Sequence, residues 1–303
     1  MKHIIRIVAI VLMLACLLVL IPSGVIVAQA EIIEYKLTDK KGLPLQKDGY
    51  NLEEMTYEDP SITVKITTGR YMDTNYMVAY VKVANPTQVR SAMSGSYRTD
   101  DTHFGHSMGK AVNAALAING DFFSSRRDEG YTARMGKVYK NVCDETYDVM
   151  VLDNMGDMHI IVAPSKQDMI DFTAQLEAEG RTIVNGYTFG PGLVINGEKQ
   201  TGFQNMNNAA HSPAQRMCLA QIGPLEYLCI STEGPEDPGS VGLTLEQFAD
   251  LVASFDGVIN AYNLDGGSSS TMVFNNKKVN APNNPKRRPL KDIIYFASAY
   301  QPD

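Results

Sequence analysis

The chain contains no tryptophan, five histidines and four cysteines in 303 residues. Without tryptophan, a lectin-type stacking platform would depend on its 15 tyrosines. Positive charge is also scarce: 27 Lys and Arg against 34 Asp and Glu give a net charge of −7, which disfavours nucleic acid and anionic lipid as main partners. Hydrophobic residues make up 44%, enough for a core, and no repeat or composition break marks a linker. We therefore expect one folded domain.

The first 30 residues differ from the rest, with 23 apolar residues and no acidic one. Lys2 and Arg6 precede an unbroken apolar run, Ile7–Ile21, and Ala28-Gln29-Ala30 supplies small residues at −3 and −1 of a cleavage site. This pattern predicts a signal peptide over residues 1–30, with an uncleaved membrane anchor as the alternative. The remaining body has 25 basic and 34 acidic residues, a net charge of −9. Either way we expect a secreted or cell-envelope protein that works outside the cytoplasm.

Three cysteines remain in the body, Cys143, Cys218 and Cys229. An odd number cannot form a complete disulfide framework, and no spacing typical of zinc ligands is present. Cys218 and Cys229 are equidistant from Gly223-Pro224, so a hairpin around that turn could bring their sulfurs together. Two buried thiols in adjacent strands are the other interpretation.

The hydrophobic pattern predicts more strands than helices. Residues 31–60 are polar and turn-rich and are expected to form a lead-in segment. The helices expected from apolar spacing and capping residues run from Ser107 to Leu116, from Ser165 to Gly180 and from Thr244 to Gly257. Strands are expected at 61–67, 77–83, 117–119, 148–152, 158–163, 192–195, 216–222, 225–231, 259–264, 271–274 and 293–298. We therefore predict an α+β fold for residues 61–303, a single domain with a largely antiparallel curved sheet and a few packed helices.

The most unusual string is Asn263–Thr271, NLDGGSSST. A predicted strand ends on Asp265, and Gly266 and Gly267 are followed by four hydroxyl residues. Glycines let backbone N–H groups face a concave site, and hydroxyls add donors, an arrangement suited to an anionic oxygen. An ordinary hairpin turn is the competing interpretation.

Three other strings are weaker on their own. Asn119-Gly120-Asp121 follows an apolar strand but is also good turn chemistry. His211 and Arg216 precede the Cys218 strand; an arginine there is usually a surface charge, although phosphate recognition needs such a guanidinium. The loop Gly186–Gly192 contains two aromatic residues and fits either a scaffold turn or a wall facing a sugar.

In combination, these strings resemble the phosphodiester glycosidase family from about residue 60 to the C-terminus. The matching segments are AINGDFF (117–123), GYTARMGKVYKN (130–141), FGPGLVINGE (189–198), HSPAQRMCLAQIG (211–223) and GLTLEQFADLVASFDGVINAYNLDGGSSSTMV (242–273). The NLDGG-S-S-TM part is the most specific. The resemblance implies hydrolysis of the bond between the anomeric carbon of a sugar, N-acetylglucosamine-like, and phosphate. Bacterial relatives are usually exported and often linked to exopolysaccharide.

The same resemblance assigns roles to matching residues. It implies Asp265 as nucleophile or as base for water, and Asp121 as a second catalytic residue, although the family often has glycine at position 121 and proline at position 215. The residues expected to bind substrate or phosphate are Asn119, Gly120, Arg134, His211, Arg216, Gly266, Gly267 and Ser268. Because the body is acidic, its phosphate-binding cations must gather locally. We therefore expect Arg134 and Arg216 to share one pocket.

Two other functions remain open from the sequence. One is a metal-assisted phosphodiesterase that uses Asn119, Asp121 and Asp265 around a divalent cation. The other is a non-catalytic protein that binds or assembles exopolysaccharide. The expected partner is a sugar-phosphate or glycopolymer, without nucleic acid, and with a membrane only through an uncleaved N-terminal segment. No cofactor is expected, and a divalent cation is left open.

Overall fold

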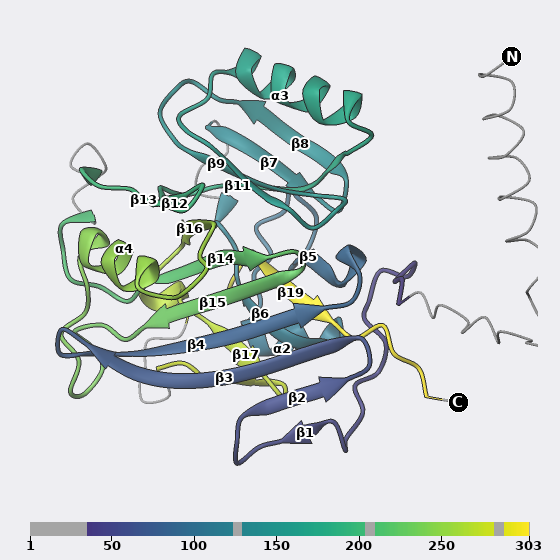
Figure 1. Cartoon of the computed structure of the whole chain (residues 1–303), viewed down its shortest axis with the longest axis vertical. Coiled ribbons are helices and arrows are strands. Elements are labelled where there is room, and N and C mark those ends of the chain that lie inside the picture. Colours follow the sequence, from purple (N-terminus) through teal and green to yellow (C-terminus); the bar gives the residue numbers. More distant parts are fainter. Residues whose placement is uncertain (1–34, 124–128, 204–209, 282–287, 303) are drawn as a thin grey trace, which may run out of the picture. The chain divides into compact units, whose positions relative to one another are not determined.

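The computed structural model describes residues 35–123, 129–203, 210–281 and 288–302 (Figure 1). The predicted signal peptide lies outside these ranges. Within them, no helix is both long enough and apolar enough to cross a membrane. The chain from Tyr35 onward forms one compact unit.

In the described residues, the strands form three sheets whose pairings are all antiparallel. The nine-stranded sheet has the order β1 (Tyr50–Asn51), β2 (Thr56–Asp59), β3 (Ile62–Tyr71), β4 (Thr74–Val83), β15 (Glu226–Thr232), β14 (Met217–Gly223), β16 (Asn260–Leu264), β12 (Gly192–Ile195), β13 (Glu198–Lys199). One five-stranded sheet has the order β10 (Met158–Ile161), β9 (Val149–Asp153), β11 (Ile183–Thr188), β7 (Gly130–Arg134), β8 (Lys137–Val142). The other has the order β18 (Lys277–Lys278), β17 (Met272–Phe274), β6 (Ala114–Asn119), β19 (Asp292–Ala297), β5 (Val89–Met93). The predicted antiparallel α+β class is confirmed, but the strands divide among several sheets.

The helical elements are α2 (Gly105–Ala111), α3 (Lys166–Ala178), α4 (Leu245–Ala253) and the short 3₁₀ turns η1 (Pro86–Gln88) and η5 (Gly267–Ser269). Two predicted capping boxes are confirmed, Ser165 with Asp168 before α3 and Thr244 with Gln247 before α4. In Figure 1, α3 covers the sheet of β7, β8, β9 and β11. α4 packs against the nine-stranded sheet, and α2 packs against β6 and β17.

The helix predicted from Ser107 to Leu116 is wrong in its second half. The helix ends at Ala111, and Asn113 takes a left-handed φ of 54° that turns the chain into β6. β6 is fully buried and pairs with β17 on one side and β19 on the other. Ladder bonds on both edges of a buried strand outweigh the helical spacing of Ala115 and Leu116.

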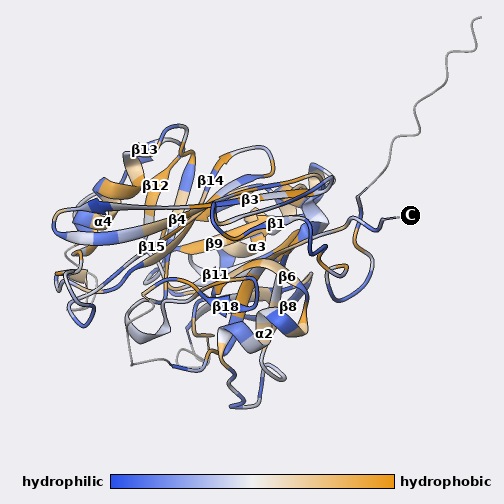
Figure 2. Ribbon diagram, turned by 90° about the horizontal axis from the view of Figure 1, so that it is seen from below, coloured by the Kyte–Doolittle hydropathy of each residue, from blue (hydrophilic) through white to orange (hydrophobic). Residues whose placement is uncertain are grey.

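The core lies between the sheets. One buried cluster joins Leu219 and Tyr262 of the nine-stranded sheet to Leu116 and Phe296 of the β6–β19 sheet. Figure 2 shows apolar segments along the inner strands and hydrophilic ones mainly on the outer loops. Removing this apolar surface from water is the main force that brings the ends of β6, β16 and β19 together.

Of the two interpretations left open for Cys218 and Cys229, the disulfide is excluded, because all three body cysteines are free and buried. In the β14–β15 ladder, Cys218 lies opposite Ile230, and Cys229 lies opposite Leu219. Neighbouring residues of a strand face opposite sides of the sheet, so the two sulfurs belong to different core clusters. The interpretation as buried thiols is confirmed.

Candidate active site

Asp265 and Asn119 lie together where β16 and β6 end. The Asn119 side-chain amide donates to the Asp265 carbonyl at 2.7 Å, and its oxygen accepts the Thr271 N–H at 3.0 Å. Asn119 is fully buried, so these bonds fix the loop after β16 to the end of β6. The structure thus joins two strings, 117–123 and 263–271, that are far apart in sequence.

The Asp265 carboxylate is partly open to solvent and ion-paired. Its side chain is 14% exposed, and its Oδ2 accepts from Nη2 of Arg288 at 2.7 Å. The guanidinium of Arg288 also lies over the ring of Phe122, 4.3 Å from the ring centroid. Sequence reasoning missed Arg288; the available signal was the basic run Lys286-Arg287-Arg288 in an acidic chain.

The glycine loop after Asp265 is packed against the backbone of Gln215 and Arg216. The Gly267 N–H donates to the Gln215 carbonyl at 3.0 Å, so this amide is used within the fold. A Cβ on Gly266 would lie 2.5 Å from the same carbonyl oxygen, which explains a glycine there by close approach. The Ser268 carbonyl accepts from the Arg288 N–H at 3.3 Å. Phosphate binding by the Gly266 and Ser268 amides stays a prediction.

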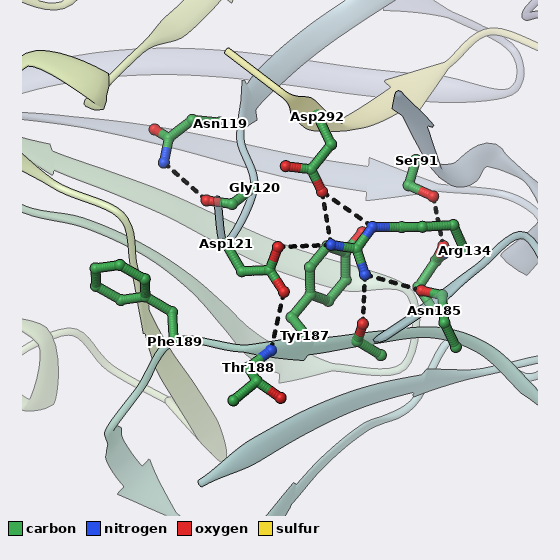
Figure 3. A network of polar contacts seen from close by, with 12 residues as sticks. Ser91, Asn119, Gly120, Asp121, Arg134, Asn185, Tyr187, Thr188, Phe189 and Asp292 are labelled. Atoms are coloured by element: carbon green, nitrogen blue, oxygen red, sulfur yellow. Dashed lines mark hydrogen bonds and ion pairs between the residues drawn. The ribbon is translucent and has the colours of Figure 1, made fainter. Parts of the chain in front are cut away.

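Arg134, on β7, lies between two buried carboxylates (Figure 3). Its Nε and Nη2 donate to Oδ2 of Asp292 at 2.9 and 2.7 Å, and Nη2 also donates to Oδ1 of Asp121 at 2.7 Å. Its Nη1 donates to the carbonyls of Ala133 and Gly186. These bonds use the five N–H donors of a guanidinium, so Arg134 has none left for the phosphate expected from the sequence.

Asp121 is 1% exposed, and both its oxygens are engaged. Oδ1 binds Arg134, and Oδ2 accepts the Thr188 N–H at 2.9 Å, which connects the end of β6 to the end of β11. Gly120 makes room for this arrangement, since a Cβ there would lie 2.3 Å from the Asp292 carboxylate. This geometry makes Asp121 a partner of Arg134; its predicted catalytic role has no support from these contacts.

Asp292, the first residue of β19, was missed by the sequence reasoning. It is 2% exposed. Its pKa is raised to about 7, chiefly by burial and also by the negative charges of Asp121 and Asp265, against the lowering effect of Arg134. A single aspartate before a buried strand is a weak sequence signal. The fold alone places this carboxyl group, which titrates near neutral pH, close to Asp265.

Arg216 is also buried, but its described acceptors are main-chain carbonyls. Its Nε donates to Leu243 at 3.0 Å and its Nη2 to Ser212 at 2.8 Å. Burial lowers its pKa to about 10. Arg134 and Arg216 share none of these partners, so the described contacts do not support the expected common phosphate pocket. Arg216 lies instead beside the glycine loop, with its Cα 3.7 Å from the place of a Cβ on Gly266.

His211 is exposed and lines a different cavity. That cavity is about 370 Å³ in volume and is also lined by Phe203, Thr244 and Glu246. Its described lining includes neither Asp265 nor Asn119. The predicted role of His211 in substrate binding therefore has no support from the described contacts of the Asp265 site.

Most of the oxygens predicted to bind a divalent cation already form hydrogen bonds within the protein. In the parts of the chain that the structure describes, no three His, Cys, Asp or Glu side chains gather as a metal site. Of the three predicted ligands, Asp121 has both oxygens bonded internally, and the Asn119 side-chain oxygen accepts the Thr271 N–H. The third, Asp265, is partly exposed and is ion-paired with Arg288.

Together, the antiparallel sheets and the two unlike aspartates, Asp265 and Asp292, define a protein with a candidate site of carboxyl groups at converging strand ends. The family model of phosphodiester glycosidase matches residues 112–297, more than half of the chain and the whole of this site. The chain therefore belongs to the phosphodiester glycosidase family.

Solved structures show the same fold. The zebrafish N-acetylglucosamine-1-phosphodiester alpha-N-acetylglucosaminidase catalytic domain, auto-inhibited by its pro-peptide, is 17% identical, with a TM-score of 0.63 over 85% of this chain and 87% of that chain. A hypothetical protein from Synechocystis is 15% identical, with a TM-score of 0.53 over 78% of this chain and 62% of that chain. Among curated protein sequences, none matches significantly. At these identities the structures support the fold alone.

Proposed function

We propose that this protein is an extracytoplasmic hydrolase that cleaves the glycosidic C–O bond between a sugar and phosphate in a sugar-1-phosphodiester of an envelope glycan. Membership of the phosphodiester glycosidase family supports the reaction class. An N-acetylglucosamine-like sugar is proposed from the substrate named for the zebrafish relative. The export signal predicted for residues 1–30 supports the location.

The observation that carries this proposal is the pair of unlike carboxyl groups. Asp265 is partly exposed and ion-paired with Arg288, whereas Asp292 is buried with its pKa raised to about 7. Glycosidases commonly separate the roles of two carboxyl groups by giving them such different surroundings. Asp265 is the more exposed of the two, so we assign it the contact with the sugar.

In the proposed reaction, Asp265 acts on the anomeric carbon as nucleophile or as base for water. The glycosidic C–O bond breaks, and its electron pair leaves with the phosphate oxygen, so strong help from a general acid is less necessary than for a sugar alcohol. The phosphate gains negative charge, which Arg216 beside the glycine loop would stabilise. Arg134, Asp121 and Asp292 hold the ends of β6, β7, β11 and β19 around this point.

The test is Asp265→Asn. Release of free sugar from an N-acetylglucosamine-1-phosphate methyl diester should fall by at least about 1,000-fold, because the reacting carboxylate is lost. Circular dichroism should show an unchanged fold. The matched control is Asp73→Asn, since Asp73 is also paired with an arginine, at 3.3 Å from Arg70, but is exposed in the turn between β3 and β4. Near-normal turnover by Asp265→Asn would contradict the proposed role.

Hydrolysis in oxygen-18 water identifies the bond that breaks. We expect the label in the released sugar, because water attacks carbon. Label in the phosphate would contradict glycosidic cleavage and favour the metal-assisted phosphodiesterase. Binding of the diester without any turnover would favour the non-catalytic alternative.

A further inference from the structure

Another cavity, separate from the one lined by His211, lies between the loop after β5 and the edge strand β8. It has a volume of about 410 Å³ and is lined by Ser96, Tyr97, Arg98, Lys137, Val138 and Tyr139. Two of these residues are cationic and none is acidic, in a body whose net charge is −9. Arg98 and Lys137 are exposed, so both can meet a ligand from solvent.

The cavity has a stacked aromatic wall. The rings of Tyr97 and Tyr139 are stacked with centroids 4.9 Å apart, and Tyr97 also stacks on Phe123 at 5.1 Å. Nζ of Lys137 lies 4.9 Å from the centroid of the Tyr139 ring. Because Tyr97 stacks on both Phe123 and Tyr139, a sugar would meet the edges of these rings, while a phosphate on that sugar would meet the adjacent cations.

The loop that forms one wall is held from inside the protein. Lys291 is 1% exposed, and its Nζ donates to the carbonyls of Ser96, Thr99 and Asp101. A buried ammonium bound to three carbonyls of one loop fixes the path of that loop. The cavity is therefore a preformed feature of the fold.

Two adjacent phenylalanines connect this cavity to Asp265. Phe122 lies under the guanidinium of Arg288, which pairs with Asp265, while Phe123 stacks on Tyr97 at the cavity wall. Phe122 has a left-handed φ of 55°, a conformation that non-glycine residues rarely adopt and that functional sites often contain. The same short segment thus contacts Arg288, the ion-pair partner of Asp265, and the aromatic wall of the cationic cavity.

We propose that this cavity binds the next sugar-phosphate unit of a polyanionic glycan, on the far side of the phosphate whose glycosidic bond is cleaved. This subsite rests on the proposed function and makes it more specific, because it selects a phosphate-containing polymer over a small diester. The cations Arg98 and Lys137 hold the second phosphate, and Tyr97 and Tyr139 contact the sugar.

The test compares a synthetic oligomer of four sugar-1-phosphate repeats with a single repeat. The wild type should show a higher kcat/KM on the oligomer, and Arg98→Ala with Lys137→Ala should reduce this preference about tenfold, the effect of two partly solvated charge contacts. Added salt should reduce the preference of the wild type more than that of the variant. The matched control is Lys65→Ala with Lys166→Ala, which removes two exposed lysines elsewhere on the surface.

Binding of the oligomer, measured by calorimetry, tests the subsite separately from the proposed hydrolase function. If no sugar is released but the Arg98 and Lys137 variant binds the oligomer about tenfold more weakly than the control variant, the proposed function fails and the subsite stands. If the wild type had the same kcat/KM for the four-repeat oligomer and for the single repeat, the subsite proposal would be overturned. The proposal would also be overturned if the Arg98 and Lys137 variant and the Lys65 and Lys166 control lost the same affinity for the oligomer. Such a result would mean that only the net charge of the protein matters.

Discussion

Arg134 and Arg216 are two buried arginines with opposite surroundings. Arg134 is 3% exposed and contacts two carboxylates, whereas Arg216 is 7% exposed and its described acceptors are neutral carbonyls. Carboxylates raise the pKa of Arg134 against the effect of burial, while burial lowers that of Arg216 to about 10. The sequence predicts one role for both residues, but their neighbours give Arg134 a structural role and keep Arg216 as the better candidate for phosphate.

The largest effect is expected for Arg134→Met. Loss of this cation leaves Asp121 and Asp292 buried without compensation, which should lower the free energy of unfolding by about 3–5 kcal/mol. This change in the free energy of unfolding is measured by urea denaturation. Arg70→Met is the control, since Arg70 forms a half-exposed pair with Asp73. Adding Asp292→Asn to Arg134→Met should recover part of the loss, and a loss no larger than that of the control would contradict the structural role.

The next effect is expected for Arg216→Lys. A lysine keeps the charge but not the fork of donors, so kcat/KM for sugar release should fall by about 100-fold. The matched control is Arg90→Lys, because Arg90 is equally buried and bonds the carbonyls of Thr87 and Asp39 away from Asp265. Both variants should lose some stability. If they also lost equal activity, Arg216 would have no special function.

The smallest effect concerns the pH dependence of stability. The pKa of Asp292 is raised to about 7, so between about pH 4 and 7 the folded protein holds a proton that the unfolded chain releases. The stability from this proton is present below about pH 4 and is lost as the pH rises through 7. From pH 5 to 8 the wild type should therefore lose about 2.5 kcal/mol more than Asp292→Asn, measured by urea denaturation. Parallel curves for the two proteins would show that Asp292 has no raised pKa.

The sequence reasoning succeeded where the signal was local. The capping boxes at Ser165 and Thr244 predicted the starts of two helices, because both partners of each box lie within one turn. It failed at Leu116, where strand pairing from both sides outweighed helical spacing. At Cys218 and Cys229 the symmetric spacing around a turn left two interpretations open, and the register of the β14–β15 ladder decides for buried thiols.

The candidate site shows the same limit. Asn119 and Asp265 were found because each stands in an unusual string of glycine, amide and carboxylate. Arg288 and Asp292 were missed because their function depends on neighbours more than 20 residues away, Asp265 and Arg134. No local pattern encodes such pairs.

By itself, the sequence determined the antiparallel α+β class and the family, since these follow from periodicity and from a series of strings that is specific in combination. It also predicted the carboxylate on which the proposed chemistry depends. The tertiary structure alone decided which charges face each other. Burial changes the pKa of a group and the strength of its ion pairs, and burial depends on contacts between distant segments. For that reason Arg134 became part of the scaffold, and Asp292 became a carboxyl group that titrates near neutral pH.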